Sequence, residues 1–154
     1  MKHVLVTTDF SELADQAIAP AAEIARGTGA ELTLAHVLGT ERPPKPQADA
    51  AYYKVAQRLY EADQELEAQA RASLEERART LSGVRCNVAL ARGEPVAGIL
   101  QIAKQQQTEM IVISSQGRTG LRRFLLGSVA EELARLSPVP VLIWKHAEEA
   151  DASG

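Results

Sequence analysis

Residues Glu109–Ser115 read Glu-Met-Ile-Val-Ile-Ser-Ser, a run of four apolar side chains that ends in two serines. Short runs rich in strand-forming residues recur along the chain, at His3–Thr8, Glu31–Val37, Arg85–Ala91 and Pro140–Lys145. Near-continuous apolar runs of this length are typical of strands in a parallel sheet that helices cover on both faces. The run at Glu109–Ser115 therefore favours a buried parallel strand.

Longer helical patterns separate these strands, over Ser11–Arg26, Ala48–Leu81, Glu94–Gln107 and Ser128–Leu136. Within the first helix Pro20 predicts a kink or a local break, and Ser11 suits a cap. The second helix carries one apolar stripe at helical spacing, formed by Leu59, Leu66, Ala70, Leu74, Ala78 and Leu81. The alternation predicts an α/β fold with a single doubly wound five-stranded parallel sheet, in strand order 3-2-1-4-5, with helices on both faces.

The 154 residues suffice for one domain. We expect it to span residues 1–146, followed by a small polar tail, 147–154, that is disordered. Three prolines within Gly39–Gln47 predict a loop that is too short to divide the chain into two domains.

Composition narrows the classes of partner. The net charge of −3 argues against a general nucleic-acid binder, which needs a broad basic surface. No apolar run reaches the roughly 18 residues that span a bilayer, so we expect no membrane contact. The chain has one cysteine, Cys86, and no signal-peptide pattern, which together favour the cytoplasm.

Ligands of open parallel sheets bind beyond the carboxyl ends of the strands, where strand order reverses. There the segment 114–128 reads Ser-Ser-Gln-Gly-Arg-Thr-Gly-Leu-Arg-Arg-Phe-Leu-Leu-Gly-Ser. Its glycines let backbone N–H groups approach an anion, and the helix that begins at Ser128 offers further N–H groups. Its arginines add positive charge. The pattern favours a phosphate-binding loop, while simple turns and a helix cap remain the alternative.

This segment resembles the signature of ATP-binding universal stress proteins, which is Gly, two residues, Gly, nine residues, then Gly-Ser or Gly-Thr. Gly117, the nine residues after it and Gly127-Ser128 match, but Ser114 stands where that family has its first glycine. The similarity spans nearly the whole chain, because it includes Thr8-Asp9-Phe10-Ser11, His36-Val37, Gly93-Glu94-Pro95 and Pro138-Val139-Pro140-Val141-Leu142.

The resemblance implies a Rossmann-like fold, similar to adenine nucleotide alpha hydrolases, that binds ATP or AMP, with Mg²⁺ or Mn²⁺ on a triphosphate. It implies that Asp9 lies near the ribose, phosphates and metal, and that Val37 packs on the adenine. The nucleotide-binding residues implied in this way are Thr7, Thr8, Asp9, Val37, Ile113, Ser114, Gly117, Arg118, Gly120, Gly127, Ser128 and Val129. The family also pairs its last strand in an antiparallel homodimer, which implies an interface at Val141, Leu142, Ile143 and Trp144.

Two other functions stay under consideration. Ser114 leaves open a dimeric interaction module of the same fold that does not bind ATP. An ATP pyrophosphatase of related fold needs a Ser-Gly-Gly-x-Asp-Ser type loop, whereas residues 7–11 read Thr-Thr-Asp-Phe-Ser. No catalytic or metal-ligand spacing is present, so we expect no enzyme beyond slow ATP hydrolysis. We expect a backbone partner for His36 and a buried, unreactive Cys86.

Overall fold

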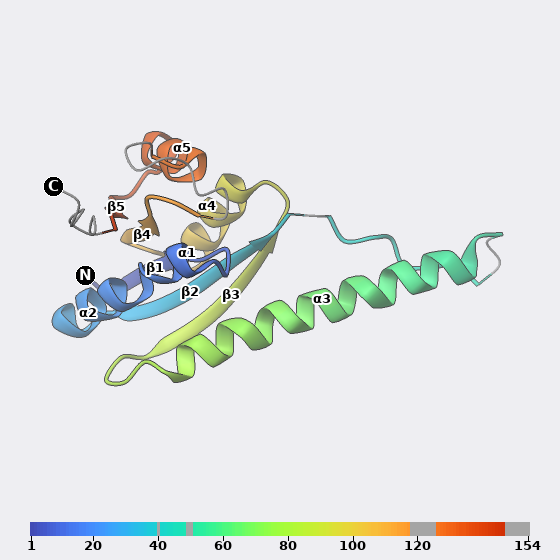
Figure 1. Ribbon diagram of the computed structural model, residues 1–154, viewed down its shortest axis with the longest axis horizontal. Helices are drawn as coiled ribbons and strands as arrows, with labels where there is room; N and C mark the ends of the chain where they lie inside the picture. The colour runs from blue at the N-terminus through green and yellow to red at the C-terminus, as the bar shows by residue number, and fades with distance from the viewer. Residues whose placement is uncertain (40, 49–50, 118–125, 147–154) are drawn as a thin grey trace, which may run out of the picture.

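A five-stranded sheet, parallel throughout, forms the centre of the molecule (Figure 1). This computed structural model describes residues 1–39, 41–48, 51–117 and 126–146. The sheet has the order β3-β2-β1-β4-β5, which confirms the predicted topology. Every strand boundary lies within one residue of its prediction, since each apolar run ends sharply at polar residues. The strands are β1 (His3–Thr7), β2 (Glu31–Leu38), β3 (Cys86–Arg92), β4 (Met110–Ser114) and β5 (Val141–Trp144).

The predicted first helix is divided into α1 (Glu12–Asp15) and α2 (Ile18–Thr28). The break falls just before Pro20, whose ring excludes the carbonyl four residues earlier and which has no N–H to donate. The predicted cap of α1 is present, because the Ser11 hydroxyl accepts a hydrogen bond from the Ala14 N–H at 3.1 Å.

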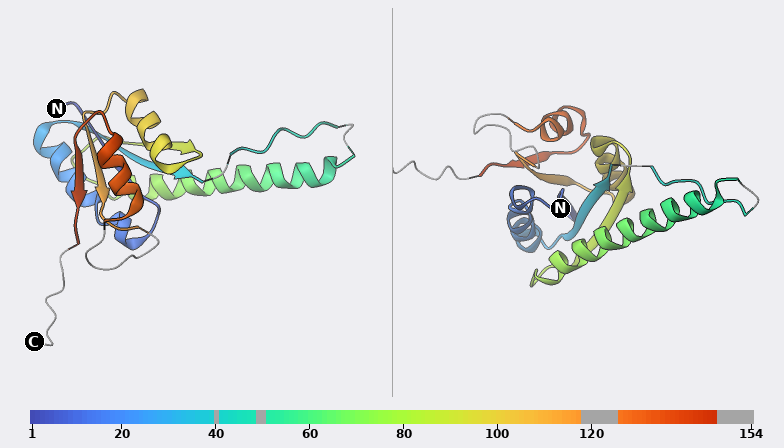
Figure 2. Two further views of the ribbon diagram at one scale, coloured as in Figure 1. Left: turned by 90° about the horizontal axis from the view of Figure 1, so that it is seen from above. Right: turned by 45° about the vertical axis from the view of Figure 1, so that its right-hand side comes forward.

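Helices α2 and α3 (Tyr53–Arg79) pack on one face of the sheet. Leu74 of α3 is fully buried there and Ala70 nearly so, but Leu59 and Leu66 are 60% and 48% exposed. The predicted apolar stripe is present, but it is buried only around Ala70 and Leu74, and its N-terminal part is exposed. In Figure 2 the N-terminal half of α3 reaches well beyond the sheet, together with the connection that precedes it.

Helices α4 (Pro95–Gln105) and α5 (Ser128–Leu136) cover the opposite face. Pro95 is the first residue of α4, where the lack of an N–H costs nothing, and the Glu94 side chain caps that helix through the Val96 and Ala97 N–H groups. Residues 41–47 have no regular structure, as their prolines predict. The expected tail, 147–154, lies outside the described residues. No described helix is both long and apolar enough to cross a membrane.

Candidate functional site

A cavity of about 240 Å³ opens at the carboxyl ends of β1, β2 and β4. This is where strand order reverses, because β1 pairs with β2 on one side and β4 on the other. Every predicted site residue that the structure describes lines this cavity, namely Thr7, Thr8, Asp9, Val37, Ile113, Ser114, Gly117, Gly127, Ser128 and Val129. Arg118 and Gly120 lie outside the described residues.

One side of the cavity is polar and tightly built around Asp9. Its Oδ1 accepts a hydrogen bond from the Ser11 N–H at 2.9 Å, which fixes the carboxylate beside the start of α1. Its Oδ2 lies against Gly117, where an added Cβ would be only 2.5 Å away. Glycine at position 117 lets the loop after β4 lie against this carboxylate, which any larger side chain would displace.

The start of α5 forms the neighbouring part of the rim. The Gly127 N–H donates to the Ser115 carbonyl at 2.7 Å, and a Cβ at 127 would lie 3.0 Å from that same oxygen. Side chains cap α1 and α4, but among the described residues none caps α5. The N–H groups of a first helical turn have no partner within the helix, so the start of α5 offers donors and a positive dipole end to the cavity.

The other side of the cavity is apolar, with Val37, Ile99 and Ile113 in its wall. Gly98 of α4 sets the position of Val37, because a Cβ there would lie 2.7 and 2.8 Å from the two valine methyl carbons. Ile99 and Ile113 belong to the same buried cluster between α4, α5 and the sheet. The cavity thus has one face suited to a flat apolar group and one suited to charged or hydroxyl groups.

Ser114, the departure from the family signature, is buried at the end of β4. Its Oγ lies 2.9 Å from His146 Nε2, and the Gln116 N–H approaches the same oxygen at 3.4 Å. The other ring nitrogen of His146 contacts Gln16 Oε1. The serine hydroxyl is thereby tied to the residues that follow β5 and α1, on the rim of the cavity.

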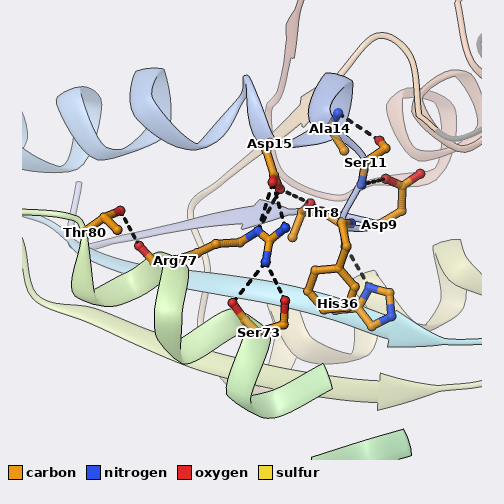
Figure 3. Close-up of polar contacts among 10 residues, drawn as sticks. Thr8, Asp9, Ser11, Ala14, Asp15, His36, Ser73, Arg77 and Thr80 are labelled. Carbon is orange, nitrogen blue, oxygen red and sulfur yellow. Dashed lines mark hydrogen bonds and ion pairs between the residues drawn. The ribbon is translucent and has the colours of Figure 1, made fainter. Parts of the chain in front are cut away.

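The loop after β1 contacts side chains of β2 and α3 as well as its own residues (Figure 3). Phe10 has a φ of 69°, a conformation that costs a non-glycine residue energy and needs support from its surroundings. Its ring stacks on His36 with centroids 4.2 Å apart, and the Arg77 guanidinium lies over it at 4.9 Å. Its N–H donates to Thr8 Oγ1 at 3.0 Å. These contacts determine where the neighbouring Asp9 lies.

Arg77 of α3 completes this support through Asp15. Its Nε and Nη2 both lie 2.9 Å from Asp15 Oδ2, and the Thr8 hydroxyl donates to Oδ1 of the same carboxylate at 2.6 Å. A chain of polar contacts thus runs from α3 through α1 to the loop that bears Asp9, as Figure 3 shows. Sequence reasoning missed this network, because its members lie far apart in the chain and each looks like an ordinary surface residue.

The sequence analysis predicted structural roles for His36 and Cys86, and the structure agrees more closely with the prediction for His36. His36 has the predicted backbone partner, since its Nδ1 lies 2.8 Å from the Thr8 carbonyl oxygen and donates to it. It also lines the cavity, near the carboxyl end of β2. Cys86 is only half-buried rather than fully buried. Burial still raises the pKa of its thiol, which keeps it protonated and poorly nucleophilic.

Several lining residues were not among the predicted nucleotide-binding residues, namely Ala14, His36, Pro95, Ile99, Ser115, Gln116 and Ala130. Ser115 and Gln116 lie between predicted residues and could have been included on that ground. Pro95 belongs to the motif Gly93-Glu94-Pro95 that is shared with the family, so the sequence also indicated its place. Ile99 and Ala130 read as core residues of helices, and nothing in the sequence separates them from other core positions.

Comparison with known proteins decides the family. The family model described as "Universal stress protein family" matches residues 1–145. The chain belongs to the universal stress protein family. Universal stress protein YxiE of Bacillus subtilis is 30% identical over 142 residues, covering 91% of this chain and 96% of YxiE. Universal stress protein MJ0531 of Methanocaldococcus jannaschii is 29% identical over 144 residues, covering 94% of this chain and 82% of that one.

Solved structures of universal stress proteins share this fold. The structure of hypothetical protein MJ0577 of Methanocaldococcus jannaschii has a TM-score of 0.71 at 26% identity, covering 95% of this chain and 96% of that one. A universal stress protein in complex with cAMP has a TM-score of 0.62 at 23% identity, covering 95% and 98%. One from Archaeoglobus fulgidus in complex with dAMP has a TM-score of 0.53 at 22% identity, covering 93% and 96%. These likenesses support the adenine nucleotide alpha hydrolase-like fold.

Proposed function

We propose that this universal stress protein binds an adenine nucleotide, ATP or AMP, in the cavity at the carboxyl ends of β1, β2 and β4. The observation that carries the proposal is the pairing of an apolar wall with a glycine-lined polar rim in one cavity. Structures of relatives in complex with cAMP and dAMP support the same ligand class.

The adenine ring suits the apolar side, between Val37, Ile99 and Ile113. A volume of about 240 Å³ is slightly below the ~300 Å³ at which small-molecule sites begin. It fits the nucleoside part of the ligand, with the phosphates at the open polar rim.

The phosphates suit the start of α5, where Gly127 and Ser128 lie on the rim and no described side chain caps the helix. Phosphate oxygens would accept hydrogen bonds from the first-turn N–H groups and gain from the helix dipole. Asp9 lies across the rim, where its carboxylate would bind a ribose hydroxyl or a Mg²⁺ or Mn²⁺ ion carried by the triphosphate.

Binding rather than turnover is the proposed activity, with ATP hydrolysis slow at most. We further propose that the protein works in the cytoplasm in the response to stress, and as a homodimer through β5. This strand lies at the edge of the sheet, and Trp144 is 39% exposed. An apolar edge strand with unpaired N–H and C=O groups invites pairing with a second copy.

The direct test is calorimetric titration of ATP and AMP into protein stripped of nucleotide, with Gly127→Val and Ser114→Gly beside the wild type. We expect wild-type binding, and no binding by Gly127→Val, because its side chain would displace the rim at Ser115. Absence of wild-type heat at millimolar ATP would overturn the proposal.

Ser114 decides between this function and an ATP-free interaction module. Its hydroxyl already contacts His146, so we expect it to stay there and leave the ribose unobstructed. Ser114→Gly should then bind ATP within about threefold of the wild type, a difference of ~0.6 kcal/mol. If only Ser114→Gly binds ATP, the wild-type protein is the interaction module.

A further inference from the structure

The protruding half of α3 presents an apolar face that nothing in the described part of the chain covers. Tyr52, Val55, Leu59 and Leu66 are 79%, 59%, 60% and 48% exposed. With Ala62, which is also exposed, they recur at spacings of three and four residues. This α3 seam (Tyr52, Val55, Leu59, Ala62 and Leu66) has the a/d pattern by which two helices pack along their length.

The edge of α3 next to the seam is its inner edge, and it is already used by its own chain. Asp63 and Glu67 form ion pairs with Arg92 at 2.9 and 2.6 Å, and Arg42 also pairs with Glu67. Further along, Ala70 and Leu74 are buried. The inner edge thus fixes the rotation of the helix, so the seam cannot turn inward to bury itself.

The seam pairs with itself when two helices run antiparallel. In that orientation Leu59 of one copy meets Ala62 of the other, and Val55 meets Leu66. Each small seam residue thereby faces a large one, which is how side chains of two helices interdigitate. The two-fold symmetry of such a pair repeats every contact, as in most homodimers.

Charge favours the same register. Arg58 and Glu65 lie beside the seam on the same side of α3, about two turns apart. Antiparallel pairing brings Arg58 of each copy beside Glu65 of the other. Within the described residues Arg58 forms no ion pair, and Glu65 contacts only the Gln69 amide, at 3.4 Å. A parallel pair in register would instead place Arg58 of one copy and Glu65 of the other on opposite sides of the seam, where they do not meet.

We propose that the α3 seam is a second self-association surface, at which two copies of this chain pair as antiparallel helices. It is separate from the proposed β5 interface and from the cavity. A chain with both interfaces would assemble beyond a dimer, each copy joined to one neighbour by β5 and to another by α3.

Sedimentation at about 100 µM tests the proposal with Leu59→Glu and a matched control, Gln64→Glu, which adds the same charge on an exposed face of α3 away from the seam. Leu59→Glu should halve the mass of the assembly, and Gln64→Glu should leave it unchanged. Equal masses for all three proteins would overturn the proposal. ATP titration of Leu59→Glu should match the wild type. A smaller assembly with unchanged ATP binding is then due to the seam and not to a change in the nucleotide site.

Orientation is tested by charge reversal and by cross-linking. Arg58→Glu should weaken association up to about tenfold, or ~1.4 kcal/mol, and adding Glu65→Arg should restore it. In a Cys86→Ser background, Leu59→Cys with Ala62→Cys should form a disulfide-linked dimer. Val55→Cys alone should not, because antiparallel pairing separates the two thiols by about 16 Å. Efficient cross-linking of Val55→Cys would contradict the antiparallel register.

Binding to lipid vesicles is the alternative outcome. If the monomer bound vesicles through the seam and did not self-associate, the seam would be a membrane-binding face, and the proposal would be overturned.

Discussion

The carboxylate of Asp9 and the backbone of Gly117 are in such close contact that one methyl group at position 117 would lie 2.5 Å from Asp9 Oδ2. Two loops that follow different strands, β1 and β4, meet at this point. The contact sets the width of the polar rim.

Gly117→Ala should therefore displace Asp9 and weaken ATP binding by at least about tenfold, or ~1.4 kcal/mol. The new methyl meets the end of a flexible side chain, so we expect the free energy of unfolding to change by less than about 1 kcal/mol. Calorimetric titration and urea denaturation measure the two quantities. Gly27→Ala is the control: its Cβ meets nothing within 4 Å, so binding should be unchanged. An unchanged affinity in Gly117→Ala would remove Asp9 from the proposed site.

Gly98→Ala tests the apolar wall. The added Cβ would lie within 2.8 Å of the Val37 methyl carbons, and a β-branched side chain cannot easily rotate away. Overpacking of this kind costs about 1–3 kcal/mol, which exceeds the ~1 kcal/mol that alanine gains over glycine in a helix. Urea denaturation should show a net loss of stability. The double variant Gly98→Ala with Val37→Ala should recover part of it, whereas equal losses in both would exclude a clash with Val37.

The strand positions could be predicted from the sequence because each strand is a short apolar run bounded by polar residues. The residues of the rim could be predicted for a related reason: they directly follow the strands, and the topology then determines which strand ends meet. Thr7–Asp9 and Ser114–Gly117 begin at the last residues of β1 and β4, which are neighbours in the sheet.

The fit between elements could not be predicted in the same way. Gly98 reads as an unfavourable residue in a helix, and its closeness to Val37 depends on how α4 lies on β2 and β3. The apolar stripe of α3 has the correct period, but periodicity does not show how far the helix extends beyond the sheet. Leu66 and Leu74 are therefore equivalent in the sequence and opposite in burial.

Arg77→Met tests the support of the loop after β1. The Arg77 and Asp15 side chains are 25% and 29% exposed, and their contact also orders Thr8 and Phe10. Losing these charged hydrogen bonds should destabilise the protein by about 1–3 kcal/mol and weaken ATP binding. Arg85→Met is the matched control. Arg85 also forms an ion pair, with Glu31, but these two side chains are 76% and 43% exposed, and exposed pairs contribute at most about 1 kcal/mol to stability. Similar losses of stability in both variants would contradict a supporting role for Arg77.

Glu67 should make a pH-dependent contribution to stability. Side-chain hydrogen bonds from Arg92, and then from Arg42, hold the pKa of Glu67 below its ordinary value of 4.5. A lowered pKa in the folded state stabilises the fold above that ordinary value, and the contribution is lost as pH falls through the folded-state pKa. Glu67→Gln should therefore cost stability at pH 7, by less than about 1 kcal/mol for this partly exposed pair, and progressively less below pH 4.5.

Denaturation of Glu67→Gln and wild type at several pH values measures this difference. An Arg92→Met background supplies the control, since the pH-dependent part of the Glu67→Gln effect should shrink once the main hydrogen-bond donor is gone. A difference in stability that stays constant from pH 7 to pH 3 would show that the ion pair does not act on the Glu67 carboxyl.

The supported conformation of Phe10 bears on the order in which the protein assembles. His36 and Arg77, which hold the ring at its φ of 69°, are made 26 and 67 residues after Phe10. A partly synthesised chain, or a folding intermediate in which α3 has not docked, lacks the contacts that offset this strained backbone. Loop-closure entropy must be overcome before such distant contacts form. We therefore expect the rim of the cavity to form late in folding, so that a ligand bound there would distinguish fully assembled molecules from those that have formed only their sheet.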